Sequence, residues 1–270
     1  MNTTDDMASF KTPTLSLDTL RTNVPAVFAD RADARTTERY KFIRTDEVVS
    51  ALLDVGFRAT GARQSGRRAV TVTDSARHLI TFQHERHNQT LVDAVPQICL
   101  INSHDATTAY QLRAGLYRPV CQNGLMVRVA DFGFIHVPHR HNVVADIVNG
   151  ALTMVQQFSD VGVVVEQMAA TLLTPLQRID FAMQALRVRY PHDVTPSIVA
   201  QDLLNQRRPR DEGNSLWITY NVIQENLLRG GLVGVTATGR RTQTRGINAI
   251  REDVRINTQL WHTAMQLIRA

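Results

Sequence analysis

Two stretches of the sequence decide the fold class: His78-Leu79-Ile80-Thr81-Phe82 and Ala94-Val95-Pro96-Gln97-Ile98-Cys99-Leu100-Ile101. Both are short, rich in β-branched and apolar residues, and bounded by polar residues, which is typical of strands. Comparable runs occupy residues 69–73, 110–120 and 132–137. Helical segments do not alternate with these runs, so the sequence favours an antiparallel or mixed sheet over a βαβ arrangement.

Upstream of these runs, the sequence predicts one short strand and one helix. Tyr40-Lys41-Phe42-Ile43 alternates like a strand, and Thr45 or Asp46 begins a helix that Gly56 ends. Residues 1–35 are interpreted as a mobile N-terminal arm with a docking segment at residues 15–20, and the charged segment 30–35 is interpreted as a solvated linker.

From residue 141 onward, the apolar residues follow helical spacing. Pro175 and Pro196 stand where helices begin, and a final helix is expected from about residue 247 to residue 268. We therefore predict an α+β protein. Residues 36–140 form a β-rich half with one early helix, and residues 141–270 form an all-helical half that packs with it as one domain.

The composition is that of a globular protein, because 270 residues with 43% hydrophobic content can bury a substantial core. It excludes disordered, collagen-like and disulfide-dense chains. The most apolar stretch, residues 147–165, is interrupted by Asp160, so we expect no membrane association. The polar first residues are unlike a secretory signal, and Cys99 and Cys121 are too few for a disulfide framework. We expect a cytoplasmic protein.

The charge is mildly basic, with 30 basic and 25 acidic residues, and only Lys11 and Lys41 are lysines. Arginine suits bidentate phosphate contacts, so this balance permits a nucleic-acid partner without requiring one. Three of the arginines, Arg63, Arg67 and Arg68, lie in a Gly/Ser-containing loop. The loop imitates a phosphate-binding loop but lacks its lysine and hydroxyl, which excludes nucleotide hydrolysis. We expect these arginines to contact DNA phosphates; the alternative is a solvated hairpin tip.

A second predicted anion site precedes the final helix, at Arg241-Thr242-Gln243-Thr244-Arg245. Thr244 is expected to cap that helix, while Arg241 and Arg245 add charge to the positive end of its dipole. The alternative is an ion pair with Glu252, Asp253 or another acidic side chain of the helical half. Arg118 completes the set of predicted nucleic-acid-binding residues.

A polar cluster is predicted where Asn102-Ser103-His104-Asp105 follows a strand. In a catalytic interpretation, Asp105 orients His104 as a base, and Cys121 beside Asn123 is the nucleophile. In the alternative interpretation, the cysteine is simply buried in the core. We expect residues 102–105 and 118–123 to meet at one polar site, and the catalytic residues remain unassigned.

Histidines gather at His136-Val137-Pro138-His139-Arg140-His141, a spacing at which imidazoles can converge on zinc. Pro138 and Arg140 crowd this run, and no cysteine or carboxylate flanks it closely. We therefore interpret it as an exposed turn, and we expect neither a metal nor a cofactor.

Several of these segments together resemble a phage/plasmid-like protein family known as domain of unknown function 932. They are Tyr40–Thr45 with Gly56-Phe57, Ala76–Ile80, Asn102–Asp105, Leu112–Leu125, Arg241–Arg245 and Asn257–Trp261. The resemblance covers roughly residues 36 to 265. Ala106 departs from it, because the family commonly has glycine there. The resemblance implies a setting on plasmids, phages and integrated elements, beside genes for single-strand binding, recombination and evasion of host defence. It implies no catalytic residues.

Three functions follow from this reading. The first is a non-catalytic, mobile-element DNA-handling protein that binds, anneals or protects single strands, with Tyr110, Tyr117 or Phe134 stacking on bases. Its modest charge predicts weak binding unless a homo-oligomer multiplies the contacts. The second is a metal-dependent nuclease or other hydrolase that uses His104, Asp105, His136 and His139. The third is a protein that inhibits a host defence enzyme through its helical half.

Overall fold

The computed structural model describes residues 13–38, 40–65, 73–118, 123–126, 134–137, 142–190 and 194–269. Its described strands form a six-stranded antiparallel sheet and a separate two-stranded one. The large sheet contains β1 (Phe57–Gln64), β2 (His78–His84), β3 (Val95–Asn102), β4 (Tyr110–Arg118), β5 (Asn123–Met126) and β6 (Phe134–Val137). The first four strands pair in sequence order. Both β5 and β6 pair with β4, one at each end of it.

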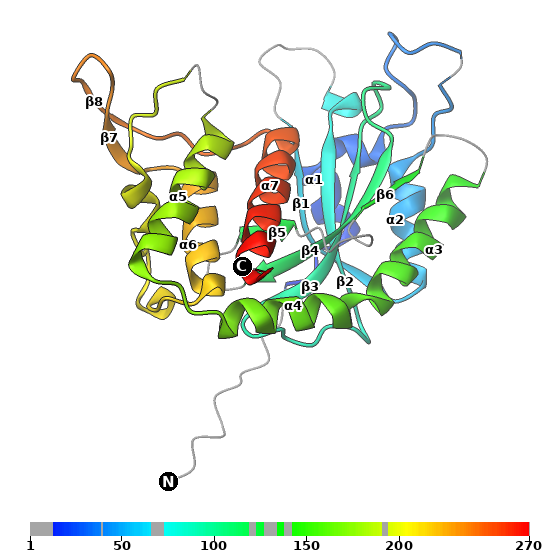
Figure 1. Cartoon of the computed structure of the whole chain (residues 1–270). Coiled ribbons are helices and arrows are strands. Elements are labelled where there is room, and N and C mark those ends of the chain that lie inside the picture. The colour runs from blue at the N-terminus through cyan, green and yellow to red at the C-terminus, as the bar shows by residue number, and fades with distance from the viewer. Residues whose placement is uncertain are drawn as a thin grey trace.

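Helices lie on both sides of this sheet (Figure 1). On one side are α2 (Thr45–Asp54) and α3 (Val143–Gln156), and on the other are α5 (Pro175–Arg189), α6 (Leu216–Arg229) and α7 (Ile250–Arg269). Between these groups, α4 (Phe158–Ala170) runs along the lower end of the sheet. The predicted α+β class is therefore confirmed. No helix among the described residues is both long enough and apolar enough to cross a membrane.

The sequence of β3 does not alternate between apolar and polar residues, because every residue of this strand is buried. Ile98 and Leu100 belong to the main core, whereas Cys99 and Ile101 pack against Ile250 of α7 on the other face. A strand that is covered on both faces has no solvated side and therefore reads as one continuous apolar run.

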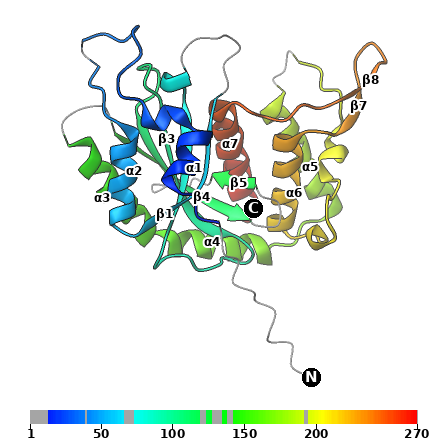
Figure 2. The ribbon, with the colours of Figure 1, turned by 180° about the vertical axis from the view of Figure 1, so that it is seen from behind.

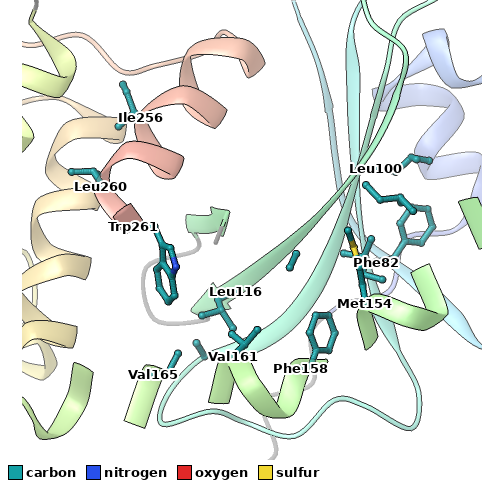
Figure 3. Close-up of a cluster of buried hydrophobic side chains, with 14 of the residues drawn as sticks. Phe82, Leu100, Leu116, Met154, Phe158, Val161, Val165, Ile256, Leu260 and Trp261 are labelled. Carbon is teal, nitrogen blue, oxygen red and sulfur yellow. The ribbon is translucent and has the colours of Figure 1, made fainter. Parts of the chain in front are cut away.

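The main core is continuous from the sheet into the helical half (Figure 3). It runs from Phe82 and Leu100 past Phe158 of α4 to Trp261 of α7, all of which are nearly inaccessible to solvent. Burying large apolar side chains from both halves in the same cluster couples their stabilities, because neither half could expose that surface without a cost.

Local signals set several element ends where the sequence predicts them. Gly56 ends α2 with a φ of 91°, a conformation that glycine adopts without strain. Pro175 occupies the first turn of α5, where Thr174 and Gln177 form a reciprocal capping box.

From residue 13 onward the N-terminal segment is docked on the sheet, at the predicted residues 15–20 and also beyond them, so this part is not a flexible arm. Seen from behind, α1 (Leu17–Asn23) lies beside β1 (Figure 2), and the Leu15 amide donates to the Ala59 carbonyl at 2.8 Å. Leu20, Val24 and Val27 are fully buried, which ties the segment to the core.

Four further expectations are wrong in detail. The linker assigned to residues 30–35 holds Asp33, which is buried and accepts from Arg35 and from Ser75 Oγ at 2.7 Å. Residues 40–43 form no strand. The helical half contains a hairpin of β7 (Val233–Val235) and β8 (Arg241–Gln243), and α7 begins at Ile250 rather than near residue 247.

Candidate functional site

The sheet face that is turned toward α7 carries polar and charged side chains, unlike the apolar face that contacts α2 and α3. Register in an antiparallel sheet places directly opposite residues on the same face. This face presents Arg63, Thr81, Gln97, Cys99, Arg113 and Tyr117 from four strands. Two cavities open here, one on each side of the first turn of α7.

The smaller cavity, of about 340 Å³, is lined by three arginines: Arg77, which directly precedes β2, Arg113 of β4 and Arg251 of α7. Arg77 Nε donates to Thr108 Oγ1 at 2.8 Å, which holds the guanidinium at the cavity wall. No carboxylate is among the described residues that line this cavity. Converging guanidinium groups without a carboxylate make a site suited to an anion.

The larger cavity, of about 470 Å³, has a mixed lining. Thr60, Thr81 and Gln97 form its polar floor, where Gln97 Nε2 donates to Thr60 Oγ1 at 3.1 Å. Tyr117 contributes an aromatic ring, and Leu228 and Ile247 are among its apolar walls. Such a lining suits a small, partly apolar group that also makes hydrogen bonds.

An apolar ridge separates the two cavities. It consists of Leu79, Cys99 and Ile101 from the sheet and Ile250 with Val254 from α7. Burial raises the pKa of the Cys99 thiol to about 12, so this cysteine is a packing residue and not a thiolate nucleophile.

An ion pair joins the two walls of the larger cavity, where Arg63 of β1 donates to the Asp253 carboxylate of α7. Burial raises the pKa of Asp253 even though the neighbouring Arg63 favours its charged form. The Asn257 amide also donates to Asp253, and Gln224 Nε2 of α6 donates to Asn257 Oδ1 at 3.1 Å. A polar chain thus connects the sheet to α6 through α7.

The predicted arginine set is divided by the structure. Arg67 and Arg68 lie outside the described residues, as does Cys121. Arg63 lines the larger cavity with its side chain 37% exposed. Arg118 is a correction: its side chain is buried between Asp93 at 2.5 Å and Asp211 at 2.6 Å, so its guanidinium is committed to the protein interior.

The second predicted anion site also differs from expectation. Thr244 does not cap α7, because its hydroxyl accepts from the Leu232 amide at 3.1 Å and the helix begins only at Ile250. Arg241 and Arg245 are exposed. The alternative ion pairs do not form among the described residues either, because Glu252 pairs with Arg255 and Asp253 with Arg63.

The predicted polar cluster is not one site. His104 follows the end of β3 that lies beside Tyr110, whereas Asn123 pairs with Arg118 at the other end of β4. Asp105 accepts from Ser103 Oγ at 2.6 Å and from the Thr107 amide at 3.1 Å, which is a local turn.

His104 instead joins a fully buried network around Thr45. The Thr45 hydroxyl lies 3.0 Å from His78 Nε2, 3.2 Å from His104 Nε2 and 3.0 Å from the Tyr110 hydroxyl. His78 Nδ1 donates to the Ala76 carbonyl at 2.9 Å, so its Nε2 is the acceptor. Burial lowers the pKa of His78 to about 4, which keeps it neutral. His78 is not among the predicted site residues, and a histidine at the start of an apolar strand is the only signal for it in the sequence.

The histidine run carries no described metal site. His136 is exposed and pairs with Gln111, on the sheet face opposite to His104 and Tyr110. His139 and His141 lie outside the described residues. Within the described ranges, no three His, Cys, Asp or Glu side chains gather as a metal centre would require.

The family model described as "Domain of unknown function (DUF932)" matches residues 34–261. The chain belongs to the DUF932 family. The UPF0380 proteins YfjQ and YafZ of Escherichia coli (strain K12) are each 37% identical to this DUF932 chain over 245 residues, covering 91% of it and 88% of each relative. No solved structure matches it.

Proposed function

We propose that this DUF932 protein is a non-catalytic DNA-handling protein of a mobile genetic element, and that it binds single-stranded DNA along the cleft between its sheet and α7. The observation that carries the proposal is the smaller cavity, where Arg77, Arg113 and Arg251 converge without a lining carboxylate. Guanidinium groups in this arrangement match the phosphodiester backbone in charge and in hydrogen-bond geometry.

The shape of the cleft favours a single strand over a duplex. Two cavities of a few hundred cubic ångströms on either side of one helix turn accept a thin, flexible chain but not a rigid double helix. Tyr117 lines the larger cavity and offers a face for base stacking. Tyr110 cannot do so because it is fully buried on the opposite face of the sheet.

One exposed arginine extends the positive surface at the rim of the cleft. Arg245 is exposed and directly precedes Gly246, which lines the larger cavity, so it can contact a phosphate that leaves the cleft. Arg241 is exposed on β8, in the hairpin that lies beyond α5 and α6 (Figure 1), and is not part of this rim. The modest net charge of +5 makes a self-associated form the better binder, because each copy adds contacts.

Fluorescence anisotropy with labelled oligothymidine tests this proposal. The triple variant Arg77→Gln, Arg113→Gln, Arg251→Gln should bind at least tenfold more weakly, and its salt slope should be shallower by about 0.7 for each lost phosphate contact. The matched control replaces three exposed arginines elsewhere, Arg31, Arg187 and Arg210, and removes the same charge. Equal losses in both variants, or no binding by the native protein, would overturn the proposal and favour a protein target.

A further inference from the structure

We infer that the larger cavity receives the base of one unstacked nucleotide, while the adjacent arginine-lined cavity holds a neighbouring phosphate. This inference rests on the proposed single-strand binding and names what the second half of the cleft recognises. The site then recognises a base together with its phosphate and does not only bind the charged backbone.

The two cavities differ in charge, and this difference assigns the base to the larger cavity and the phosphate to the smaller one. In the larger cavity, Arg63 is paired with Asp253, and Arg229 is paired with Glu225 at 2.7 Å. Both lining arginines are therefore already neutralised by carboxylates. In the smaller cavity, three arginines converge and no described carboxylate takes part in the lining. A neutral group suits the first environment and an anion the second.

The lining of the larger cavity matches the chemistry of a nucleobase. A base has flat apolar faces and an edge of donors and acceptors. Tyr117, Leu228 and Ile247 supply aromatic and apolar surface. Gln97, which is only 3% exposed, and the hydroxyls of Thr60 and Thr81 supply fixed hydrogen-bonding groups at the floor. The volume of about 470 Å³ leaves room for a base and its sugar.

The spacing of the cavities fits one backbone unit of an extended strand. Cys99 lines the larger cavity and Ile101 the smaller one. They are two residues apart on the same face of β3, a separation of about 7 Å. A base can therefore enter one cavity while a phosphate next to its sugar reaches the other, with the apolar ridge between them.

A comparison of two strands isolates the base from the phosphates. The full chain is titrated with labelled oligothymidine and with the same oligonucleotide carrying abasic sites, which keeps the phosphates and removes bases. The native protein should bind the normal strand at least tenfold more tightly. Cys99→Leu, which adds side-chain volume at the wall of the larger cavity, should abolish this preference, so that the normal strand binds no more tightly than the abasic one. Cys99→Ala, which leaves the cavity open, should retain the preference.

A second variant keeps the test decisive if Cys99→Leu does not fold. Tyr117→Leu removes the stacking ring and should reduce the preference severalfold. Two outcomes overturn the inference: equal affinity of the native protein for both strands, or a full preference in folded Cys99→Leu or Tyr117→Leu. If the strands bind equally but the triple arginine variant loses affinity, the inference fails and the proposed function stands. If neither strand binds, both fail.

Discussion

Arg63 Nη2 of β1 donates a hydrogen bond to Asp253 Oδ2 of α7, a residue 190 positions later in the chain. The two side chains differ in environment: that of Asp253 is 9% exposed and that of Arg63 is 37% exposed. The pair therefore fastens the final helix to the first strand and closes one wall of the larger cavity.

This difference in exposure predicts unequal effects of breaking the pair. Arg63→Ala leaves a buried carboxylate without its partner and should lower the free energy of unfolding by about 2 kcal/mol. Asp253→Asn leaves an arginine that water can reach, and should cost about 1 kcal/mol or less. Urea denaturation of both variants measures this, and equal losses would contradict the account.

The buried His78 predicts acid sensitivity. Its pKa is about 4 in the folded protein and 6.5 in the unfolded chain, so the unfolded chain binds more protons between these values. Stability is therefore fully present above pH 6.5 and is lost as pH falls toward 4, by about 3 kcal/mol. Denaturation across this window should show the slope, and His78→Gln should flatten it.

Replacing Ala106 with glycine should stabilise the protein. Its φ is 59°, in the left-handed region that costs a residue with a Cβ about 1 kcal/mol, and the sequence resemblance indicates glycine as the common residue there. Ala106→Gly should raise the free energy of unfolding by about 0.5 kcal/mol, after the entropy that glycine adds to the unfolded chain is subtracted. Ala237→Gly, where φ is not positive, should be destabilising instead. Thermal denaturation compares the two, and the same sign for both would refute the strain.

Arg118 predicts a large structural loss. Its removal would take the shared cation away from the carboxylates of Asp93 and the buried Asp211, although Arg208 still pairs with Asp211 at 3.1 Å and Trp217 Nε1 still donates to Asp93 at 2.8 Å. Arg118→Met should cost about 3 kcal/mol or more, whereas Arg187→Met on the surface of α5 should cost little. Where Arg118→Met remains folded, its affinity for oligothymidine should equal that of the native protein; a selective loss of affinity would restore Arg118 to the DNA contacts.

Local patterns in the sequence determined most of the regular structure. β-Branched and apolar runs predicted β2 and β3, apolar spacing with a terminal glycine predicted α2, and Pro175 predicted the start of α5. The patterns that predict these elements involve residues that are near one another in the sequence, so the sequence alone is enough to recognise them.

The site depended on interactions that no local pattern records. Whether an arginine meets a carboxylate or solvent is decided by strand register and by how α7 packs on the sheet, and this separated Arg118, buried between two aspartates, from Arg113, which lines a cavity. The same packing placed His104 and Asn123 at opposite ends of β4. Polar side chains find partners through the tertiary fold, because burial penalises any charge that lacks one and the partner can come from any distance along the chain.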